Sequence, residues 1–399
     1  MLALAIAGCG VMGKRHVRGL AKLKEINQLP FRLVAACDPI PESANALADL
    51  AEELLGERPA CYPDLAAARA ATTINALDIT TAPALHPPVA LEAFAHSIDV
   101  MVEKPIALTV SGGREIVDTA TRLGRVLSVA ENYRRDPINR LAKALLDAGV
   151  IGRPYLAAQH FSGWGEKVII TPWRHRKQSG GIAIDMGVHY ADILEYFFGE
   201  ITHVVGMGAI VDTTRLAADG STHPVDAEDL TVGSTRFANG AVASWMLDLA
   251  GRGGDAFLRT LYGTGGTIAI PNDRTGSPLV VRSWQDGAPV DLAPHEQLAR
   301  VPAFRLDPVT AALFGGDRLA SYAMTWADID ANLLAIEYDD FARAITTSTP
   351  PEVDGAQGLR SLAISYGFLE SERTGRILPV TELLDGRSTP YQDEIDTSI

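Results

Sequence analysis

Residues 2–16 read LALAIAGCGVMGKRH and contain the pattern G-x-G-x-x-G at Gly8, Gly10 and Gly13. The apolar run Leu2–Ala7 before the glycines is typical of a strand that is buried on both faces. A helical spacing of apolar residues follows the last glycine. A glycine turn between a first strand and a helix exposes backbone N–H groups at a helix N-terminus, where they can bind a pyrophosphate. The stretch therefore predicts a nucleotide-binding turn.

The same letters resemble an export signal, because an apolar run precedes small residues and Cys9. Signal peptides, however, begin with a positive region followed by about 7–15 apolar residues. No Lys or Arg precedes this run, and the first basic residues are Lys14 and Arg15. The sequence also lacks an uninterrupted apolar run of the roughly 18 residues that a membrane span needs. We therefore expect neither export nor a membrane.

Composition narrows the class of protein further. The 399 residues suffice for two domains, and the hydrophobic fraction of 47% can fill their cores. The formal net charge of −14 disfavours nucleic acid and anionic lipid as partners. Cys9, Cys37 and Cys61 form no CxxC pair and no disulfide framework, which favours a reducing, cytoplasmic compartment.

Strands and helices alternate through the first third of the chain. A helix is expected between Pro41 and Gly56, because proline favours the start and glycine the end of a helix. The strands expected after the first one are Phe31–Cys37, Ile74–Thr80, Asp99–Glu103 and Arg125–Ala130. Such alternation predicts a parallel, doubly wound sheet.

Asp38 follows the second expected strand, at the distance from the glycine turn where an acid accepts hydrogen bonds from an adenosine ribose. A carboxylate at this place repels a 2′-phosphate. No Lys or Arg occurs between Asp38 and Gly56 to neutralise such a phosphate. The sequence therefore predicts NAD as the preferred cofactor over NADP.

Lys104 lies just past the end of a strand, between Glu103 and Pro105. Open α/β sheets bind their ligands at this edge. Taken alone, the residue is more typical of an exposed lysine at a strand end than of a ligand site.

A second cluster lies in the helical stretch between Gly181 and Phe198. Asp185 and His189 are four residues apart, so both project from one face of a helix. A carboxylate one turn from an imidazole can orient the ring and support its charged form. Asp192, three residues further on, is either a supporting partner or a solvated surface acid.

These motifs together resemble the glucose–fructose oxidoreductase, inositol dehydrogenase and MocA-type (Gfo/Idh/MocA) oxidoreductases. The resemblance runs nearly end to end. It rests on GCGVMGKRH, the Asp38 position, TTAPALH at 80–86, EKP at 103–105, ENYRR at 131–135, the G-x-x-x-D-x-G-x-H run from Gly181 to His189, and PPEVDGAQGLRSLAISYGFLES near the C-terminus. EKP together with D-x-G-x-H is specific, whereas the glycine motif alone is not. Ser179 departs from the many relatives that carry a third glycine there.

The resemblance implies an α/β fold with an N-terminal Rossmann domain, residues 1–130. Residues 131–399 would form a C-terminal α/β domain with a large, mostly antiparallel open sheet, and its closing helix near 355–375 would pack back on the first domain. One sheet face would cover the nicotinamide site, and the other would join subunits in a homodimer or a homotetramer. Strand-like runs at Ile201–Val211, Asp229–Phe237 and Gly240–Leu249 fit this sheet. We interpret residues 287–321 as an irregular insertion.

The resemblance also assigns the catalytic roles to Lys104, Asp185 and His189. Lys104 would contact the nicotinamide ribose and the substrate oxygen. His189, oriented by Asp185, is the preferred base for the reacting hydroxyl, and Lys104 is the alternative. Cofactor contacts are expected from Gly8, Gly10, Val11, Met12, Gly13, Asp38, Thr80, Thr81, His86, Glu103, Lys104, Asn132, Trp173 and Arg174. Substrate contacts are expected from Lys104, Asn132, Tyr133, Arg176, Asp185 and His189, and no metal is expected.

The activity implied is NAD-dependent oxidation of a carbinol in a sugar, polyol or sugar derivative to a ketone or lactone. One alternative is a glycoside-cleaving enzyme of the same superfamily that oxidises a sugar transiently with tightly held NAD. Another is a non-catalytic NAD-sensing regulator, against which the three retained catalytic residues argue.

The segment WRHRK at 173–177 raises the question of substrate charge, because a local basic run can attract an anion. We expect Arg176 to contact an anionic substrate. The alternative is a solvated loop whose Arg174 touches the cofactor.

Overall fold

A six-stranded parallel sheet forms the first part of this computed structural model, which describes residues 1–396. Its strands run in the order β3-β2-β1-β4-β5-β6. They are β1 (Leu2–Ala7), β2 (Phe31–Cys37), β3 (Ala60–Tyr62), β4 (Ala76–Ile79), β5 (Asp99–Glu103) and β6 (Leu127–Ala130). The order reverses between β1 and β4, and ligands bind outside the carboxyl ends of strands at such a point. The predicted Rossmann-type sheet is confirmed.

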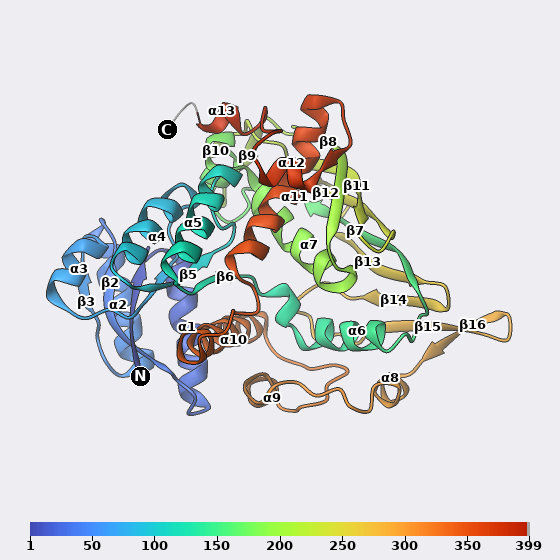
Figure 1. Cartoon of the computed structure of the whole chain (residues 1–399), viewed down its shortest axis with the longest axis horizontal. Helices are drawn as coiled ribbons and strands as arrows, with labels where there is room; N and C mark the ends of the chain where they lie inside the picture. The colour runs from blue at the N-terminus through green and yellow to red at the C-terminus, as the bar shows by residue number, and fades with distance from the viewer. Residues whose placement is uncertain (397–399) are drawn as a thin grey trace.

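Helices cover both faces of this sheet (Figure 1). In sequence order they are α1 (Val11–Glu25), α2 (Pro41–Leu55), α3 (Leu65–Ala71), α4 (His86–Ala95) and α5 (Val110–Leu123). The α2 helix illustrates why they form where they do, since Pro41 occupies its first turn and Gly56 ends it in the left-handed region at φ 87°. Its Leu47 is fully buried. Burying such a side chain stabilises the fold by about 1.5–3 kcal/mol relative to leaving it in water.

The second sheet has nine strands in the order β16-β15-β14-β13-β7-β12-β11-β8-β17, and only β7 and β12 pair in parallel. The strands are β7 (Pro154–Trp164), β8 (Ile201–Ala209), β11 (Leu230–Phe237), β12 (Val242–Gly251), β13 (Ala256–Gly263), β14 (Gly266–Ile270), β15 (Val280–Gln285), β16 (Ala288–Leu292) and β17 (Leu378–Pro379). One face packs against α6 (Pro137–Asp147), α7 (Ile182–Phe198) and α11 (Gly355–Thr374). The predicted mostly antiparallel sheet is confirmed. A separate hairpin, β9 (Thr214–Leu216) and β10 (Thr222–Pro224), lies beside the loop that follows β7.

The stretch 287–321 is more regular than the sequence suggested. It contains β16 and two short helices, α8 (Pro294–Arg300) and α9 (Pro308–Phe314). Both helices begin at a proline, and the Asp307 carboxylate caps the second. Seven-residue helices are too short to show a clear apolar periodicity, and this is why the sequence pattern of 287–321 resembles an irregular insertion.

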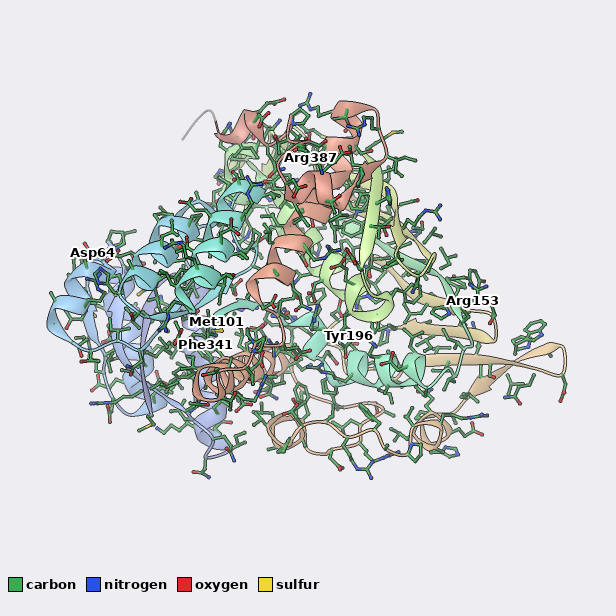
Figure 2. All side chains as sticks on the ribbon, in the orientation of Figure 1. Asp64, Met101, Arg153, Tyr196, Phe341 and Arg387 are labelled. Carbon is green, nitrogen blue, oxygen red and sulfur yellow. The ribbon has the colours of Figure 1, made fainter. Side chains whose placement is uncertain are left out.

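Two long helices from the C-terminal part lie against the first sheet. The α10 helix (Trp326–Thr347) packs along α1 (Figure 1), so closely that a Cβ on Gly19 would lie 2.8 Å from Cβ of Leu334. Phe341 of α10 shares a buried cluster with Met101 of β5 (Figure 2). The α11 helix touches α5 and β6 on one side and α7 and β8 on the other. The chain thus returns to the first sheet after it completes most of the second, and α11 packs against elements of both.

The described chain ends in two short helices, α12 (Val380–Leu384) and α13 (Asp393–Asp396). Within residues 1–396, no helix combines the length and the apolar character that a membrane crossing needs.

Candidate active site

The glycine turn lies between β1 and α1 and is shaped for close approach of a ligand. Gly8 has φ 97°, and a Cβ there would lie 2.7 Å from the backbone of Thr80. At Gly10 a Cβ would meet nothing within 4 Å, so this backbone faces open space. Gly10 also precedes α1 without any side-chain cap on the first-turn N–H groups. Uncapped N–H groups beside open space fit a dinucleotide's pyrophosphate.

Asp38 is held beside this turn. Its carboxylate accepts the N–H of Cys9 at 2.8 Å and the N–H of Ile40 at 2.9 Å. Two backbone donors fix the carboxylate and leave lone pairs free, since a carboxylate has about four acceptor sites. The position therefore fits hydrogen bonds from ribose hydroxyls.

Three other residues predicted to contact the cofactor lie beneath or beside the turn. The Thr80 hydroxyl donates to the carbonyl of Gly8. Thr81 is half-buried at the strand end. The ring nitrogens of His86 face the carbonyls of Thr81 and Pro105 at 3.1 and 3.0 Å, and the side chain is buried. His86 thus braces these two loops.

A cavity of about 1070 Å³ opens between the glycine turn and the nine-stranded sheet. It brings together predicted residues from both parts of the chain: Val11, Met12, Glu103, Lys104, Asn132, Tyr133, Arg174, Asp185 and His189. Trp173 instead borders a much smaller neighbouring pocket that shares Arg174 and Asp185. The cavity is where the chemistry of these motifs can meet.

Lys104 and Asp185 form a buried ion pair in this cavity. Lys104 Nζ donates to Asp185 Oδ1 at 3.0 Å and to the Asp185 carbonyl at 2.9 Å. The other carboxylate oxygen, Oδ2, accepts from Arg174 Nε at 3.2 Å. Burial opposes ionisation, but the charges of Lys104 and Arg174 prevail and lower the pKa of Asp185. The pair fixes the ammonium group at the cavity wall with a third N–H available to a ligand.

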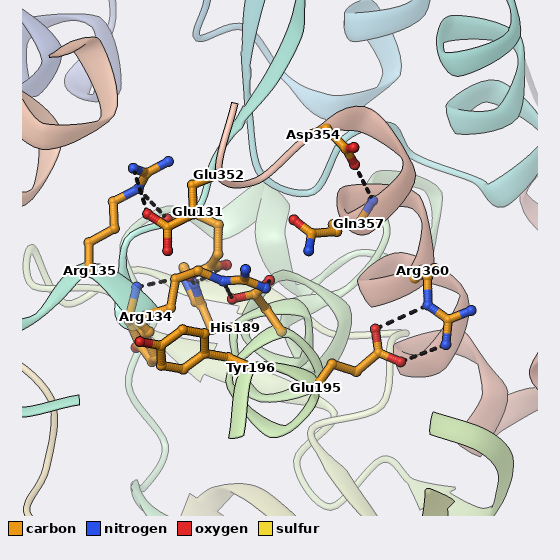
Figure 3. Close-up of polar contacts among 12 residues, drawn as sticks. Glu131, Arg134, Arg135, His189, Glu195, Tyr196, Glu352, Asp354, Gln357 and Arg360 are labelled. Atoms are coloured by element: carbon orange, nitrogen blue, oxygen red, sulfur yellow. Dashed lines mark hydrogen bonds and ion pairs between the residues drawn. The ribbon is translucent and has the colours of Figure 1, made fainter. Parts of the chain in front are cut away.

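His189 is oriented by Glu131 and not, as the sequence suggested, by Asp185 (Figure 3). Its Nδ1 lies 2.7 Å from both carboxylate oxygens of Glu131. The helical spacing does place Asp185 and His189 on one face, but Lys104 and Arg174 occupy the Asp185 carboxylate. Glu131 directly follows β6, just as Lys104 directly follows the neighbouring strand β5, and this strand-end position is the signal that could have revealed it.

The electrostatics of the pair define a base. Burial lowers the pKa of His189, although Glu131 opposes that shift. Burial opposes ionisation of Glu131, yet its charge and hydrogen-bond interactions with His189 lower the Glu131 pKa to about 2. Near neutral pH the carboxylate is therefore ionised and the imidazole is neutral. Nδ1 donates to Glu131, which leaves Nε2 as the nitrogen that can accept a proton.

Neighbouring side chains hold the imidazole in place. The Tyr133 ring stacks on the His189 ring, with centroids 4.2 Å apart and an angle of 4° between the planes. Asp192 is buried and accepts two hydrogen bonds from Arg134, so it is a supporting acid and not a solvated one. Arg134 also lies over the Tyr196 ring at 5.3 Å (Figure 3).

Of the WRHRK segment, Arg174 alone lines the cavity. Arg176 is 41% exposed, pairs with Asp226 at 2.7 Å and does not line the cavity, so the expectation that it contacts substrate is wrong. His175 is buried and accepts the N–H of Ile169, and burial lowers its pKa to about 4. Lys177 bonds to Glu394. The segment forms two consecutive 3-10 helices, Pro172–His175 and Lys177–Ser179. Its basic side chains therefore point in different directions, Arg174 toward the cavity and Arg176 toward Asp226.

A buried polar cluster beneath the site could not be read from the sequence. His16 Nδ1 lies 2.8 Å from Asp78, and its Nε2 lies 2.9 Å from Glu103. Burial opposes the charge, but these two carboxylates raise the pKa of His16. The resulting imidazolium holds the carboxylate of Glu103, the residue that precedes Lys104 in the chain. Tyr338 of α10 donates to Asp78 as well, so the cluster joins four elements, α1, β4, β5 and α10.

Among residues 1–396, no group of three or more His, Cys, Asp and Glu side chains is arranged to hold a metal ion.

Comparison with known families settles the class. Residues 2–131 match the model of an oxidoreductase family with an NAD-binding Rossmann fold. Residues 139–269 match the GFO/IDH/MocA C-terminal domain. The chain belongs to the Gfo/Idh/MocA oxidoreductase family. It is thus an NAD-binding oxidoreductase, as its glycine turn and cavity indicate.

Similar proteins span most of this Gfo/Idh/MocA oxidoreductase. A D-apiose dehydrogenase of Paraburkholderia graminis is 26% identical over 385 residues, which is 95% of this chain and 90% of that protein. The scyllo-inositol 2-dehydrogenase (NAD(+)) of Bacillus subtilis is 27% identical over 306 residues, 76% of this chain and 83% of that protein. An NAD binding oxidoreductase from Klebsiella pneumoniae has a similar fold, with a TM-score of 0.77, 22% identity and coverage of 95% and 99% of the two chains.

Proposed function

We propose that the protein is an NAD-dependent dehydrogenase that oxidises a carbinol of a sugar, polyol or sugar derivative to a ketone or lactone. The observation that carries the proposal is that His189, hydrogen-bonded to Glu131, lines the same cavity as Lys104 and the glycine-turn residues Val11 and Met12. NAD, when bound, accepts the hydride that leaves the carbinol carbon. The named activities of the similar proteins, D-apiose and scyllo-inositol dehydrogenation, support this substrate class.

The side chains divide the remaining work. His189 Nε2 takes the hydroxyl proton, because its neutral imidazole is fixed by Glu131 and by the Tyr133 ring. Lys104 donates to the same oxygen and stabilises negative charge that develops on it, while Asp185 keeps the ammonium group in position. Arg174, held by the same carboxylate, borders the site.

A screen of sugars, polyols and sugar acids for NADH formation tests the proposal. We expect at least one of them to yield NADH and a ketone or lactone in equal amounts. Release of a free sugar from a glycoside without net NADH would overturn it in favour of oxidoreductive glycoside cleavage.

The free thiols of Cys9, Cys37 and Cys61 support a reducing, cytoplasmic location as part of the proposal.

Asp38 is proposed to make the enzyme prefer NAD to NADP. Replacing Asp38 by Ala together with Ile40→Arg should lower kcat/KM for NAD by about 10–100-fold, the worth of one charge-assisted hydrogen bond. The exposed Ile40 position can accept an arginine, which would bind a 2′-phosphate and raise kcat/KM for NADP. Steady-state kinetics with both cofactors provide the measurement, and Glu42→Ala on α2 is the control. A parent enzyme that already favours NADP would contradict this role.

We further propose that a second copy of the chain covers the outer face of the nine-stranded sheet. The register places Met207, Val232, Met246, His160 and Leu258 side by side across five neighbouring strands on that face. Met207 is 65% exposed, and Val232 and Leu258 are exposed as well. Apolar side chains gathered on an open sheet mark an interaction surface, and a self-complementary face gives closed oligomers.

Met207→Lys should disrupt this association, because it buries an unpaired charge in an apolar interface. We expect the parent to sediment as two or four copies and the variant to shift toward one copy. Leu123→Lys, at an exposed position on α5, serves as the matched control. A monomeric parent at micromolar concentration would refute the interface.

A further inference from the structure

We propose that Arg274 binds an anionic group of the substrate, so that the enzyme acts on a carboxylated or phosphorylated sugar derivative in preference to a neutral sugar. The inference rests on the proposed function, because it assumes that the substrate occupies the cavity beside His189. Arg274 lies in the loop after β14, whereas the basic segment WRHRK, which the sequence suggested for this role, lies before α7.

The position of Arg274 supports this role. Its side chain lines the cavity. Its guanidinium lies 5.5 Å from the centroid of the Tyr133 ring, which also stacks on His189. Tyr133 thus contacts both the proposed base and the proposed anion site. A small molecule whose hydroxyl reaches His189 can therefore reach Arg274 with another of its substituents.

The charge balance at Arg274 is incomplete. Its ion pair within the described residues is with Asp330, at 3.2 Å from Nη1 to Oδ1. Both oxygens of Asp330 already accept from Arg15, with Nε at 2.8 Å from Oδ2. Two guanidinium groups therefore share one carboxylate, and one positive charge at the cavity wall is not neutralised. A partly buried cation without its own counter-ion favours binding of an anion.

Other carboxylates near Arg274 are engaged elsewhere. Asp273 forms two hydrogen bonds to Arg259, at 2.6 and 2.9 Å. Asp136 accepts from the Tyr322 hydroxyl at 2.7 Å and meets only the backbone N–H of Arg274. Neither carboxylate forms an ion pair with the guanidinium of Arg274. The excess charge therefore persists after the neighbouring acids are considered.

The Arg274 guanidinium is held in place while some of its N–H donors remain unused. Its Cζ lies 5.4 Å from the centroid of the Trp326 ring, and its Nη2 donates to the neutral amide oxygen of Asn132 at 2.8 Å. A guanidinium has five N–H groups, so donors remain for a carboxylate or phosphate. The backbone of Arg274 adopts φ 61°, a region that costs a non-glycine residue free energy and is often kept at functional positions.

The competing occupant is the cofactor itself, because Arg15 lies on α1 close to Met12 and shares Asp330 with Arg274. In that case Arg274 would stabilise the cofactor's pyrophosphate and would not distinguish substrates. The two occupants make different predictions for NADH affinity and for the preference between charged and neutral sugars.

The test compares kcat/KM for neutral sugars with kcat/KM for their uronic acids, aldonic acids and phosphates. We expect the parent to favour the anionic compounds, and the uronate and phosphate arms identify which anion fits. Arg274→Ala should lower the ratio of charged to neutral kcat/KM by about 10–100-fold, as loss of a charge-assisted contact does. Arg274→Lys, which keeps the charge without the planar fork, should retain part of the preference. Arg176→Ala is the control, since that residue lies outside the cavity.

Calorimetric binding of the same compounds to the NADH-loaded protein makes the test independent of turnover. The inference is overturned if neutral and charged sugars bind and react equally well in the parent. It is also overturned if Arg274→Ala leaves the ratio unchanged, including a case in which the substitution weakens NADH binding. A dehydrogenase that favours neutral sugars would refute only this inference, whereas failure of every sugar to yield NADH would refute the proposed function.

Discussion

Lys104→Met is expected to lower kcat by at least about 10³-fold, the combined effect of losing a positioned donor and its charge next to the reacting oxygen. Methionine keeps much of the lysine's length but cannot donate to the substrate oxygen. NAD should still bind, because the glycine turn and Asp38 provide contacts that do not involve the ammonium group. Single-turnover rates measure the loss, and NADH fluorescence titration measures binding.

Lys143→Met is the matched control for this variant. Lys143 lies on α6 and pairs with Asp147 away from the cavity, so its loss should leave kcat unchanged. Near-normal turnover in Lys104→Met would exclude Lys104 from the chemical step. Loss of NADH binding together with turnover would assign it to the cofactor alone.

His189→Ala is expected to lower kcat by about 10²–10⁴-fold, the usual effect of removing a positioned general base. His295→Ala, on the exposed start of α8, is the control. An unchanged kcat in His189→Ala would remove this residue from the mechanism and leave Lys104 as the proton acceptor.

The pH profile distinguishes a base from a merely structural residue. Activity needs neutral His189, so kcat/KM should fall as pH drops through the pKa of this imidazole. Burial places that pKa below the ordinary histidine value. Glu131→Gln removes a negative charge that favours the imidazolium, so the acid limb should move to still lower pH while kcat falls through lost orientation. A shift of the limb to higher pH would contradict the pairing.

The first sheet could be predicted closely from the sequence. Its strands are buried on both faces, and such strands appear as short apolar runs with sharp ends, as at Leu2–Ala7, Phe31–Cys37 and Asp99–Glu103. The three-residue strand β3 is too short to show a pattern in the sequence. The helix α10, which packs along α1, is likewise not among the elements that the sequence predicts.

The candidate site was predictable only where chemistry coincided with a strand end or a helical repeat. Lys104 and His189 met that condition. The partner of His189 was harder to predict. Glu131 also follows a strand end, but it is separated from His189 by 58 positions, and Asp185 on the same helix is the more obvious partner. Arg176 illustrates the opposite error, in which a basic run was read as a site although its members turn away from one another.

Arg274 shows most clearly what tertiary structure adds. Nothing in the local sequence distinguishes it from other arginines, and its surroundings come from the loop after β6 and from the start of α10. A shared counter-ion such as Asp330 becomes visible only when distant segments are placed together.

The most direct test of the proposed dehydrogenase is to measure its product balance. The parent enzyme is incubated with NAD and a panel of sugars, polyols and sugar acids, NADH is measured by absorbance, and the sugar products are identified by mass spectrometry. We expect at least one compound to lose two hydrogen atoms, giving a ketone or lactone with one NADH formed per molecule oxidised. Oxidation should be absent in Lys104→Met. Cleavage of a glycosidic bond without NADH accumulation, or equal product formation by Lys104→Met, would contradict the account.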